Sequence, residues 1–264
     1  MIQFRSHGSR GDFVIVLHGG PGAAGYMAPV ARGLSDLFRV LEPFQRGSGG
    51  QSLTVAQHVE DLHSLIQSSC AGAQPAMVGH SWGAMLALAY AAEHRNFAGP
   101  LALVGCGTFD SRARERMQAT VEDRMSQAVR SRMQRLADDF PDPDERLRAS
   151  ADLLAPLYSY DLEQGESEEL RCDAEAFEQS WQDMLRLQQM GVYPACFADI
   201  RSPVLMLHGA HDPHPGRMIR AGLQPYLPHL EYQELARCGH YPWRERAARA
   251  EFFAVLRRWL SNPA

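Results

Sequence analysis

A serine lies between two glycines in the segment Gly79-His80-Ser81-Trp82-Gly83, where an apolar stretch gives way to a helical pattern. A serine at a strand-to-helix corner points its hydroxyl out of a sheet only with a positive φ angle, which is strained for a residue with a side chain. The glycines two positions before and after it relieve the crowding. We therefore interpret Ser81 as a candidate nucleophile, and a purely structural serine is the alternative.

A nucleophilic serine needs two N–H donors for the negative charge that develops on the attacked carbonyl oxygen. The first is the backbone N–H of Trp82, which opens the following helix, where the helix dipole also favours an anion. The second is expected from the loop after a neighbouring strand, and the segment HGGPG, residues 18–22, offers one. Gly20 lets a backbone amide approach a substrate closely, and Pro21 stiffens the loop. Gly20 and Trp82 are therefore the predicted oxyanion hole.

A candidate acid and a candidate base follow near the end of the chain. Asp212 lies just past a strong strand signal, in HGAHDPHP, and His240 lies just past the next strand, in ARCGHYPW. The separation of 28 positions is about one helix plus one strand, so the two loops should be neighbours at one edge of the sheet. The chain order Ser81, Asp212, His240 is that of Ser–Asp–His triads in α/β folds. In such a triad His240 takes the serine proton and Asp212 fixes the imidazole tautomer.

Two alternatives to this assignment stay open. Asp110, which follows another strand, could serve as the acid instead of Asp212. His208, His211 and His214 lie near Asp212 in the sequence and could form a metal site with it. However, His208 falls inside a strand and the His-x-x-His spacing is loose. We expect neither a metal nor a cofactor.

The elements that must position these residues alternate between short apolar runs and helical patterns, which is typical of βαβ units and a mainly parallel sheet flanked by helices. We expect strands at residues 13–19, 39–44, 76–81, 101–105, 203–209 and 230–236, with a short edge strand within 1–6. We expect helices at residues 26–36, 54–69, 83–94, 215–225 and 242–260.

One interval breaks this alternation. From residue 109 to residue 199 no convincing strand signal occurs, and the segment has the pattern of several helices. Apolar residues recur every four positions from Met117 to Met133, a pattern that more often marks a packed core than a binding surface. A helical block inserted into a parallel sheet must sit on one end of it. We therefore expect a core domain, residues 1–108 and 200–264, with an all-helical lid at 109–199.

Composition and charge exclude several function classes. A formal net charge of −5 argues against a nucleic-acid partner, and all 26 basic residues are arginine, which excludes a lysine base or Schiff base. The five cysteines are scattered without CxxC spacing, so neither a zinc site nor a disulfide framework is indicated. The N-terminus has no apolar signal region and no apolar run is long enough to span a bilayer. We expect a cytoplasmic protein without a membrane partner, and nothing indicates its oligomeric state.

The combination of HGGPG, GHSWG, HGAHD and CGHYPW resembles the α/β-hydrolase fold family. Within that family it is similar to the proline iminopeptidase-like branch, whose members include aminopeptidases and many esterases. These motifs cover the first ~100 and the last ~65 residues, and the middle of the chain matches no family motif. The resemblance implies a triad of Ser81, Asp212 and His240, with Gly20 and Trp82 as the oxyanion donors.

Two features bear on the substrate. Phe44 stands where the branch usually has the aspartate of an Asp-Gln-Arg-Gly-x-Gly segment, so polar contacts made through that aspartate are absent. An iminopeptidase also needs lid carboxylates to hold the substrate amine, and seven acids are candidates: Glu163, Glu166, Glu168, Glu169, Asp173, Glu175 and Glu178. Closely spaced acidic residues are also typical of an ordinary solvent-exposed surface. We therefore favour an esterase over an N-terminal aminopeptidase of the proline iminopeptidase type.

The leading hypothesis is a serine hydrolase that cleaves a small ester or amide, or a short peptide, through an acyl-enzyme. A cofactor-free dioxygenase of the same fold, which would use the His–Asp pair as a base and Ser81 only to orient the substrate, is a second hypothesis. A ligand-binding module without turnover is a third, although such a module has no need of Ser, His and Asp together. Dehalogenase and the usual epoxide hydrolase chemistry are disfavoured, because both need an aspartate at the position where this chain has Ser81.

Overall fold

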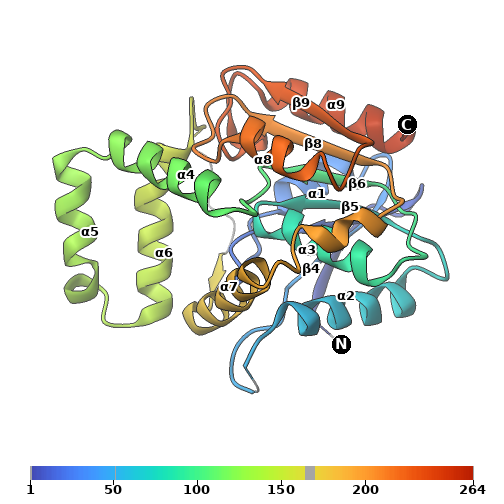
Figure 1. Ribbon diagram of the computed structural model, residues 1–264, viewed down its shortest axis with the longest axis horizontal. Coiled ribbons are helices and arrows are strands. Elements are labelled where there is room, and N and C mark those ends of the chain that lie inside the picture. The colour runs from blue at the N-terminus through green and yellow to red at the C-terminus, as the bar shows by residue number, and fades with distance from the viewer. Residues whose placement is uncertain (1, 51, 164–169, 264) are drawn as a thin grey trace.

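The computed structural model describes residues 2–50, 52–163 and 170–263, and its centre is a seven-stranded sheet (Figure 1). The strand order is β1-β4-β2-β5-β6-β8-β9, and every neighbouring pair is parallel except β1 with β4. The strands are β1 (Phe4–His7), β2 (Phe13–Leu17), β4 (Arg39–Pro43), β5 (Ala76–His80), β6 (Leu101–Val104), β8 (Val204–Gly209) and β9 (Leu230–Leu235). The predicted mainly parallel α/β sheet is thus confirmed.

Helices cover both faces of this sheet and bury it on both sides (Figure 1). One layer holds α1 (Ala28–Leu34) and α9 (Arg249–Ser261), and the other holds α2 (Val55–Ser69), α3 (Trp82–Glu93) and α8 (Gly216–Leu223). Along β2, Val14 and Val16 pack with the first layer, whereas Ile15 and Leu17 pack with the second. Burial on both faces explains why β2 has a continuous apolar sequence and not an alternating one. Among the described residues, no helix is long and apolar enough to cross a membrane.

The last predicted helix begins later than its apolar pattern suggests. We expected a helix over 242–260, but α9 begins at Arg249, and the preceding segment contains only the short 3₁₀ helix η3 (Pro242–Arg244). The chain there wraps around the buried carboxylate of Glu245 instead. That carboxylate accepts hydrogen bonds from the backbone N–H groups of Gly239, Tyr160 and Asp161. These contacts fix the segment just after His240. They are tertiary contacts, so the apolar pattern of the sequence could not predict them.

The segment between β6 and β8 is mostly helical and extends to one side of the sheet (Figure 1). Its helices are α4 (Ser111–Arg124), α5 (Gln127–Asp139), α6 (Pro143–Leu154), η1 (Ala155–Tyr158), α7 (Ala174–Gln189) and η2 (Ala195–Asp199). The apolar stripe of residues 117–133 does not lie on one helix. Helix α4 ends at Arg124, and Ser126 caps the start of α5 by accepting a hydrogen bond from the Val129 N–H. The stripe residues Met117, Met125 and Met133 are half-buried.

This segment also contains a strand, so the expectation of an all-helical insertion needs correction. Strand β7 (Arg171–Cys172) pairs antiparallel with β3 (Ala23–Ala24), just after the HGGPG loop. A pair of two-residue strands is too short to show a period-2 pattern, so this pairing could not be predicted from the residues. The pairing links the inserted segment directly to the loop that carries Gly20.

Helix α7 is hydrogen-bonded to the beginning of α2. The Asp183 carboxylate accepts a hydrogen bond from the Val55 N–H at 2.8 Å, and Ser180 Oγ lies 2.8 Å from His58 Nε2. Because Asp183, Ser180 and His58 are buried, each of these polar groups needs such a partner. Helix α7, the last α-helix of the insertion, is therefore held against the core domain by buried hydrogen bonds.

Candidate active site

Ser81 lies directly between β5 and α3 with φ +53° and ψ −114°, a conformation that is strained for a residue with a Cβ atom. Its glycine neighbours are required by close packing. A Cβ atom on Gly79 would collide with the carbonyl oxygen of Gly83, and one on Gly83 would collide with that of Leu17. A Cβ atom on Gly19 would lie 2.7 Å from the Ser81 Cβ. The glycines around Ser81 therefore let β5, α3 and the HGGPG loop meet at the serine.

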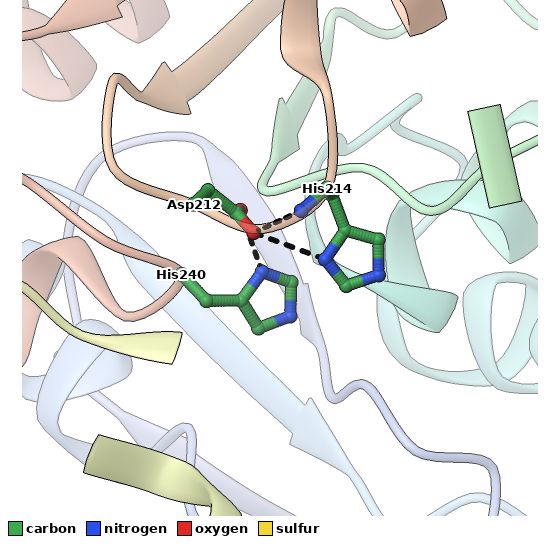
Figure 2. A group of neighbouring side chains, drawn as sticks. All are labelled: Asp212, His214 and His240. Atoms are coloured by element: carbon green, nitrogen blue, oxygen red, sulfur yellow. Dashed lines mark hydrogen bonds and ion pairs between the residues drawn. The ribbon is translucent and has the colours of Figure 1, made fainter. Parts of the chain in front are cut away.

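Asp212 and His240 lie in the loops after β8 and β9, and their side chains meet (Figure 2). His240 Nδ1 is 2.7 Å from Asp212 Oδ2, and both side chains are buried. Burial lowers the pKa of His240 below its ordinary 6.5. The ring is therefore neutral at pH 7, with its Nδ1–H donating to the carboxylate and its Nε2 lone pair available. The fallback acid Asp110 instead caps α4, where it accepts a hydrogen bond from the Ala113 N–H at 2.8 Å.

A second imidazole shares the same carboxylate, and we did not assign it a catalytic role from the sequence. The Asp212 Oδ1 lies 3.0 Å from His214 Nδ1 and accepts a hydrogen bond from the His214 backbone N–H at 2.9 Å (Figure 2). The His214 ring stacks on the His240 ring, with centroids 4.5 Å apart and an interplanar angle of 17°. Burial alone raises the pKa of Asp212, yet the imidazoles of His240, His214 and His208 hold it well below its ordinary value. Asp212 is therefore a carboxylate at neutral pH.

Of the three histidines of the alternative metal site, His208 and His214 stay beside Asp212, with His208 Nε2 at 3.3 Å from Asp212 Oδ2, whereas His211 does not. His208 Nε2 donates to the His214 carbonyl oxygen at 2.9 Å, and the His211 ring packs against Tyr160. Within the described parts of the chain, the group with metal-binding spacing is Asp212, His214 and His240, whose ligand atoms all lie within 4.8 Å of one another. A metal bound by these three residues would occupy His240 and compete with its use as a base.

The predicted residues share one cavity of about 350 Å³. Ser81, His240, Gly20 and Trp82 all line it, and Asp212 lies behind His240. Apolar side chains from the core and from the inserted helices form much of the wall: Met85, Leu147, Leu154, Tyr158, Phe177 and Trp181. The volume and the apolar walls are those of a pocket for a small organic molecule.

A larger hollow of about 640 Å³ lies between residues 44–50 and residues 171–173. Neither Ser81 nor His240 lines it. Its charged groups also have partners, since Arg46 forms a 2.6 Å ion pair with Asp61 and Asp173 accepts a hydrogen bond from the Ser48 N–H. We therefore place the candidate site in the smaller cavity, where the reactive groups converge.

Gln45 links the two predicted oxyanion segments. Its side-chain oxygen accepts a hydrogen bond from Trp82 Nε1 at 2.7 Å, and its side-chain nitrogen donates to the His18 carbonyl oxygen at 2.9 Å. Its backbone N–H donates to His18 Nε2 at 3.1 Å. Gly20 has φ +52°, and Trp82, as the first residue of α3, has a backbone N–H without an intrahelical acceptor. Gly20, Trp82 and Ser81 all line the same cavity, and Gln45 holds the two segments together through His18 and the Trp82 indole.

Phe44 makes different contacts from an aspartate at this position. The guanidinium groups of Arg5 and Arg171 lie 5.1 Å and 5.2 Å from the centre of its ring. Cation–π contacts of this kind replace the polar contacts that a carboxylate would make. Phe44 thus packs the start of the loop that carries Gln45 against two arginines.

Tyr26 and His80 join the HGGPG loop to the base. The Gly19 N–H donates to the Tyr26 hydroxyl at 2.6 Å, and that hydroxyl donates to His80 Nδ1 at 2.7 Å. His80 Nε2 then donates to the His240 carbonyl oxygen at 2.9 Å. Burial holds the pKa of His80 well below 6.5, which keeps the ring neutral with these donor and acceptor roles. His80 belongs to the GHSWG motif, whereas no sequence signal pointed to Tyr26.

The candidate lid acids that the structure describes do not line the cavity. Glu166, Glu168 and Glu169 lie outside the described residues. Glu163 pairs with Arg249, Asp173 caps α7, and Glu175 and Glu178 hydrogen-bond glutamines one helical turn away. None of these four lines the cavity, whereas Asp152 and Arg244, which the sequence reasoning missed, both do.

With this geometry in hand, comparison with known proteins identifies the family. Residues 14–254 match the sequence profile described as "Alpha/beta hydrolase family". The chain belongs to the alpha/beta hydrolase family. This alpha/beta hydrolase is similar to the enol-lactonase from Burkholderia xenovorans LB400, with a TM-score of 0.65 and 20% identity over 99% of this chain and 96% of the other. It is also similar to an esterase from Thermogutta terrifontis, with a TM-score of 0.65 and 20% identity over 98% and 93%. At this identity the likeness shows the fold.

A curated relative adds a shorter match. The alpha/beta hydrolase is 26% identical over 108 residues to the cis-3-alkyl-4-alkyloxetan-2-one decarboxylase of Shewanella oneidensis. The match covers 38% of this chain and 34% of the relative, so it spans about a third of that protein's length. The family predicted from the motifs is confirmed, and the proline iminopeptidase-like branch stays a prediction.

Proposed function

We propose that this alpha/beta hydrolase is a serine hydrolase that cleaves small esters through an acyl-enzyme. The observation that carries the proposal is the 2.7 Å contact between Asp212 and His240 beside Ser81, which sits on a left-handed turn in the same cavity. A neutral imidazole held in one tautomer by a buried carboxylate is the base that a serine nucleophile requires.

The reaction proceeds in two halves. Ser81 Oγ attacks the ester carbonyl as His240 Nε2 takes its proton, and the backbone N–H groups of Gly20 and Trp82 stabilise the oxyanion. His240 then gives the proton to the departing alcohol, which leaves an acyl group on Ser81. Water, deprotonated by His240, attacks the acyl carbon and releases the acid, and the proton returns to Ser81. Asp212 stabilises the imidazolium form of His240 in both halves.

The inserted residues 109–199 are the lid in this proposal, over a core of residues 1–108 and 200–264. Support comes from α6, η1 and α7, which supply cavity-lining side chains such as Leu154, Tyr158 and Phe177. These apolar walls help to exclude water from around the reacting ester. The four described acids proposed for amine binding do not line the cavity, which supports an ester over an N-terminal peptide. The enol-lactonase and the esterase named above act, by their names, on lactones or esters, which are cleaved at the same kind of carbonyl.

A substrate screen tests the proposal. We expect turnover of p-nitrophenyl esters of short acids and little turnover of prolyl or alanyl arylamides. Ser81→Ala should lower kcat by about 10⁶-fold, since removal of a catalytic serine has effects of that order. Ser150→Ala removes a hydroxyl from the same cavity and should retain most of the activity. Arylamide turnover without ester turnover would overturn the ester preference. Oxygen-dependent turnover that persists in Ser81→Ala would overturn acyl transfer in favour of a dioxygenase.

A further inference from the structure

Arg244 places a positive charge at the candidate site. It lies four residues after His240, in η3, and its half-buried side chain lines the cavity that holds Ser81 and His240. Its guanidinium carbon lies 5.9 Å from the centre of the Tyr241 ring. An arginine stays charged at every accessible pH, so the cavity contains a permanent cation.

This cation differs from its neighbours because it has no anionic partner within the described residues. Arg246 pairs with Asp161 at 3.2 Å, and Arg249 pairs with Glu163 at 2.9 Å. For Arg244, none of the carboxylates in the parts of the chain that the structure describes lies within the 4.0 Å of an ion pair. The adjacent carboxylate of Glu245 is occupied by three backbone N–H groups. The guanidinium donors of Arg244 therefore remain available to a ligand.

The rest of the cavity defines the ligand that would suit these donors. Two carboxylates come near it. Asp212 is buried behind His240 and already accepts hydrogen bonds, and Asp152 lines the cavity but is exposed to solvent. The remaining wall is mostly apolar. A half-buried guanidinium on an apolar wall binds a carboxylate through two parallel charge-assisted hydrogen bonds, which are stronger than neutral ones.

We propose that Arg244 binds a carboxylate of the substrate, so that the enzyme acts on esters with an apolar body and one free carboxylate. This inference rests on the proposed ester hydrolysis. The carboxylate belongs either to the acyl group, as in the monoester of a dicarboxylic acid, or to the leaving group, as in an acylated hydroxy acid. Both present the same anion to Arg244, and matched substrates separate them.

The experiment compares charged and neutral esters of equal length. The acyl arm pairs the p-nitrophenyl monoester of glutaric acid with p-nitrophenyl pentanoate. The leaving-group arm pairs 4-acetoxybenzoate with 4-acetoxybenzamide. We expect the wild-type enzyme to prefer the anionic ester in one arm. In Arg244→Gln, the ratio of kcat/KM for the anionic ester to that for the neutral ester should fall about 10- to 100-fold. Arg246→Gln, which removes a neighbouring charge outside the cavity, should keep the wild-type ratio.

The contrary results are also distinct. Equal kcat/KM for both esters in both arms, or an unchanged ratio in Arg244→Gln, would overturn the anion site. A ratio that is unchanged in Arg244→Gln but falls in Arg246→Gln would assign the preference to surface charge.

If no ester is hydrolysed, the proposed function fails, but the binding of heptanoate still tests the role of Arg244. Heptanoate should raise the Tm of the wild-type protein but not of Arg244→Gln, while heptanamide should raise neither. Equal shifts in both proteins would overturn the inference.

Discussion

At the scale of single residues, the site depends on how the Asp212 carboxylate is divided between two imidazoles. Oδ2 faces His240 Nδ1 and Oδ1 faces His214 Nδ1, so each ring is oriented by its own carboxylate oxygen. Hydrogen bonds to a charged group are stronger than neutral ones and fix the tautomer of each ring. His214 is thus placed to orient Asp212, and the stacking of its ring on His240 makes the charges of the two rings interdependent.

The first prediction concerns the pH dependence of the reaction. Burial lowers the pKa of His240 below 6.5, and the base acts only when neutral. The value of kcat/KM should therefore rise with pH through a midpoint below 6.5 and stay level through neutral pH. A pH profile with a p-nitrophenyl ester measures this midpoint. A midpoint at or above 6.5 would show that the buried imidazole is not the base, or that its surroundings differ from those described.

A second prediction separates His214 from a merely structural residue. A charged His214 ring lowers the pKa of His240, so His214→Leu should move the acid limb of the kcat/KM profile to higher pH. Loss of the hydrogen bond to Asp212 should also lower kcat by about 10-fold. His214→Asn, which keeps a side-chain N–H near Asp212, should recover part of kcat. If His214→Leu lowers the activity without moving the midpoint, His214 supports the loop and does not influence the base.

At the scale of elements, the site depends on close contacts between backbone segments. Helix α3 approaches β2 so closely that Gly83 faces the Leu17 carbonyl oxygen without room for a Cβ atom. The same approach holds the α3 N-terminus and the HGGPG loop beside Ser81. Glycine at this position is therefore required by packing, since backbone atoms cannot rotate away as a flexible side chain can.

The third prediction tests this contact. Gly83→Ala should push α3 away from β2 and lower the free energy of unfolding by about 1–3 kcal/mol, as overpacking does. It should also lower kcat, because the Ser81 hydroxyl moves with α3. Gly222→Ala is the matched control, since its Cβ atom on α8 would lie 3.6 Å from Asp110. That substitution should stabilise the protein by about 0.5–1 kcal/mol through helix propensity. Urea unfolding of both variants measures these changes, and a Gly83→Ala variant as stable as Gly222→Ala would contradict the packing argument.

At the scale of the whole molecule, several buried histidines are kept neutral by the fold. Burial lowers the pKa of His18 to about 4 and that of His58 to about 4. In the unfolded chain each has an ordinary pKa of about 6.5 and takes up a proton earlier as pH falls. The unfolded state therefore binds more protons between pH 6.5 and 4, so acid favours unfolding in that range.

The fourth prediction gives the size of this effect. The stabilisation from each histidine is complete above pH 6.5 and is lost as pH falls through about 4, on the order of 3 kcal/mol for each by pH 4. His58→Gln keeps a polar group facing Ser180 but removes one titrating group. In this variant, the number of protons taken up on unfolding, which sets the slope of the unfolding free energy against pH, should fall by up to one. An unchanged slope between pH 4 and 6.5 would show that His58 is already protonated in the folded protein.

Much of the fold, and part of the candidate site, could be predicted from local sequence. The β2 and β8 strands are continuous apolar runs, and the carboxyl ends of parallel strands meet at one edge, so Asp212 and His240 could be expected together. Tyr26, Gln45 and Arg244 could not, because their roles depend on tertiary contacts. Tyr26, for example, reaches His80 across 54 positions of the chain. The β3–β7 pair was likewise too short for a periodic signal.

The most direct test of the central claim is covalent labelling of the nucleophile. A fluorophosphonate probe reacts with a serine activated by a neighbouring base, and peptide mass spectrometry locates the modified residue. We predict one label per chain, on Ser81, with no label in Ser81→Ala and strongly reduced labelling in His240→Ala. Labelling of a different residue, or labelling of His240→Ala at the wild-type rate, would contradict the assignment of Ser81 and His240 as nucleophile and base.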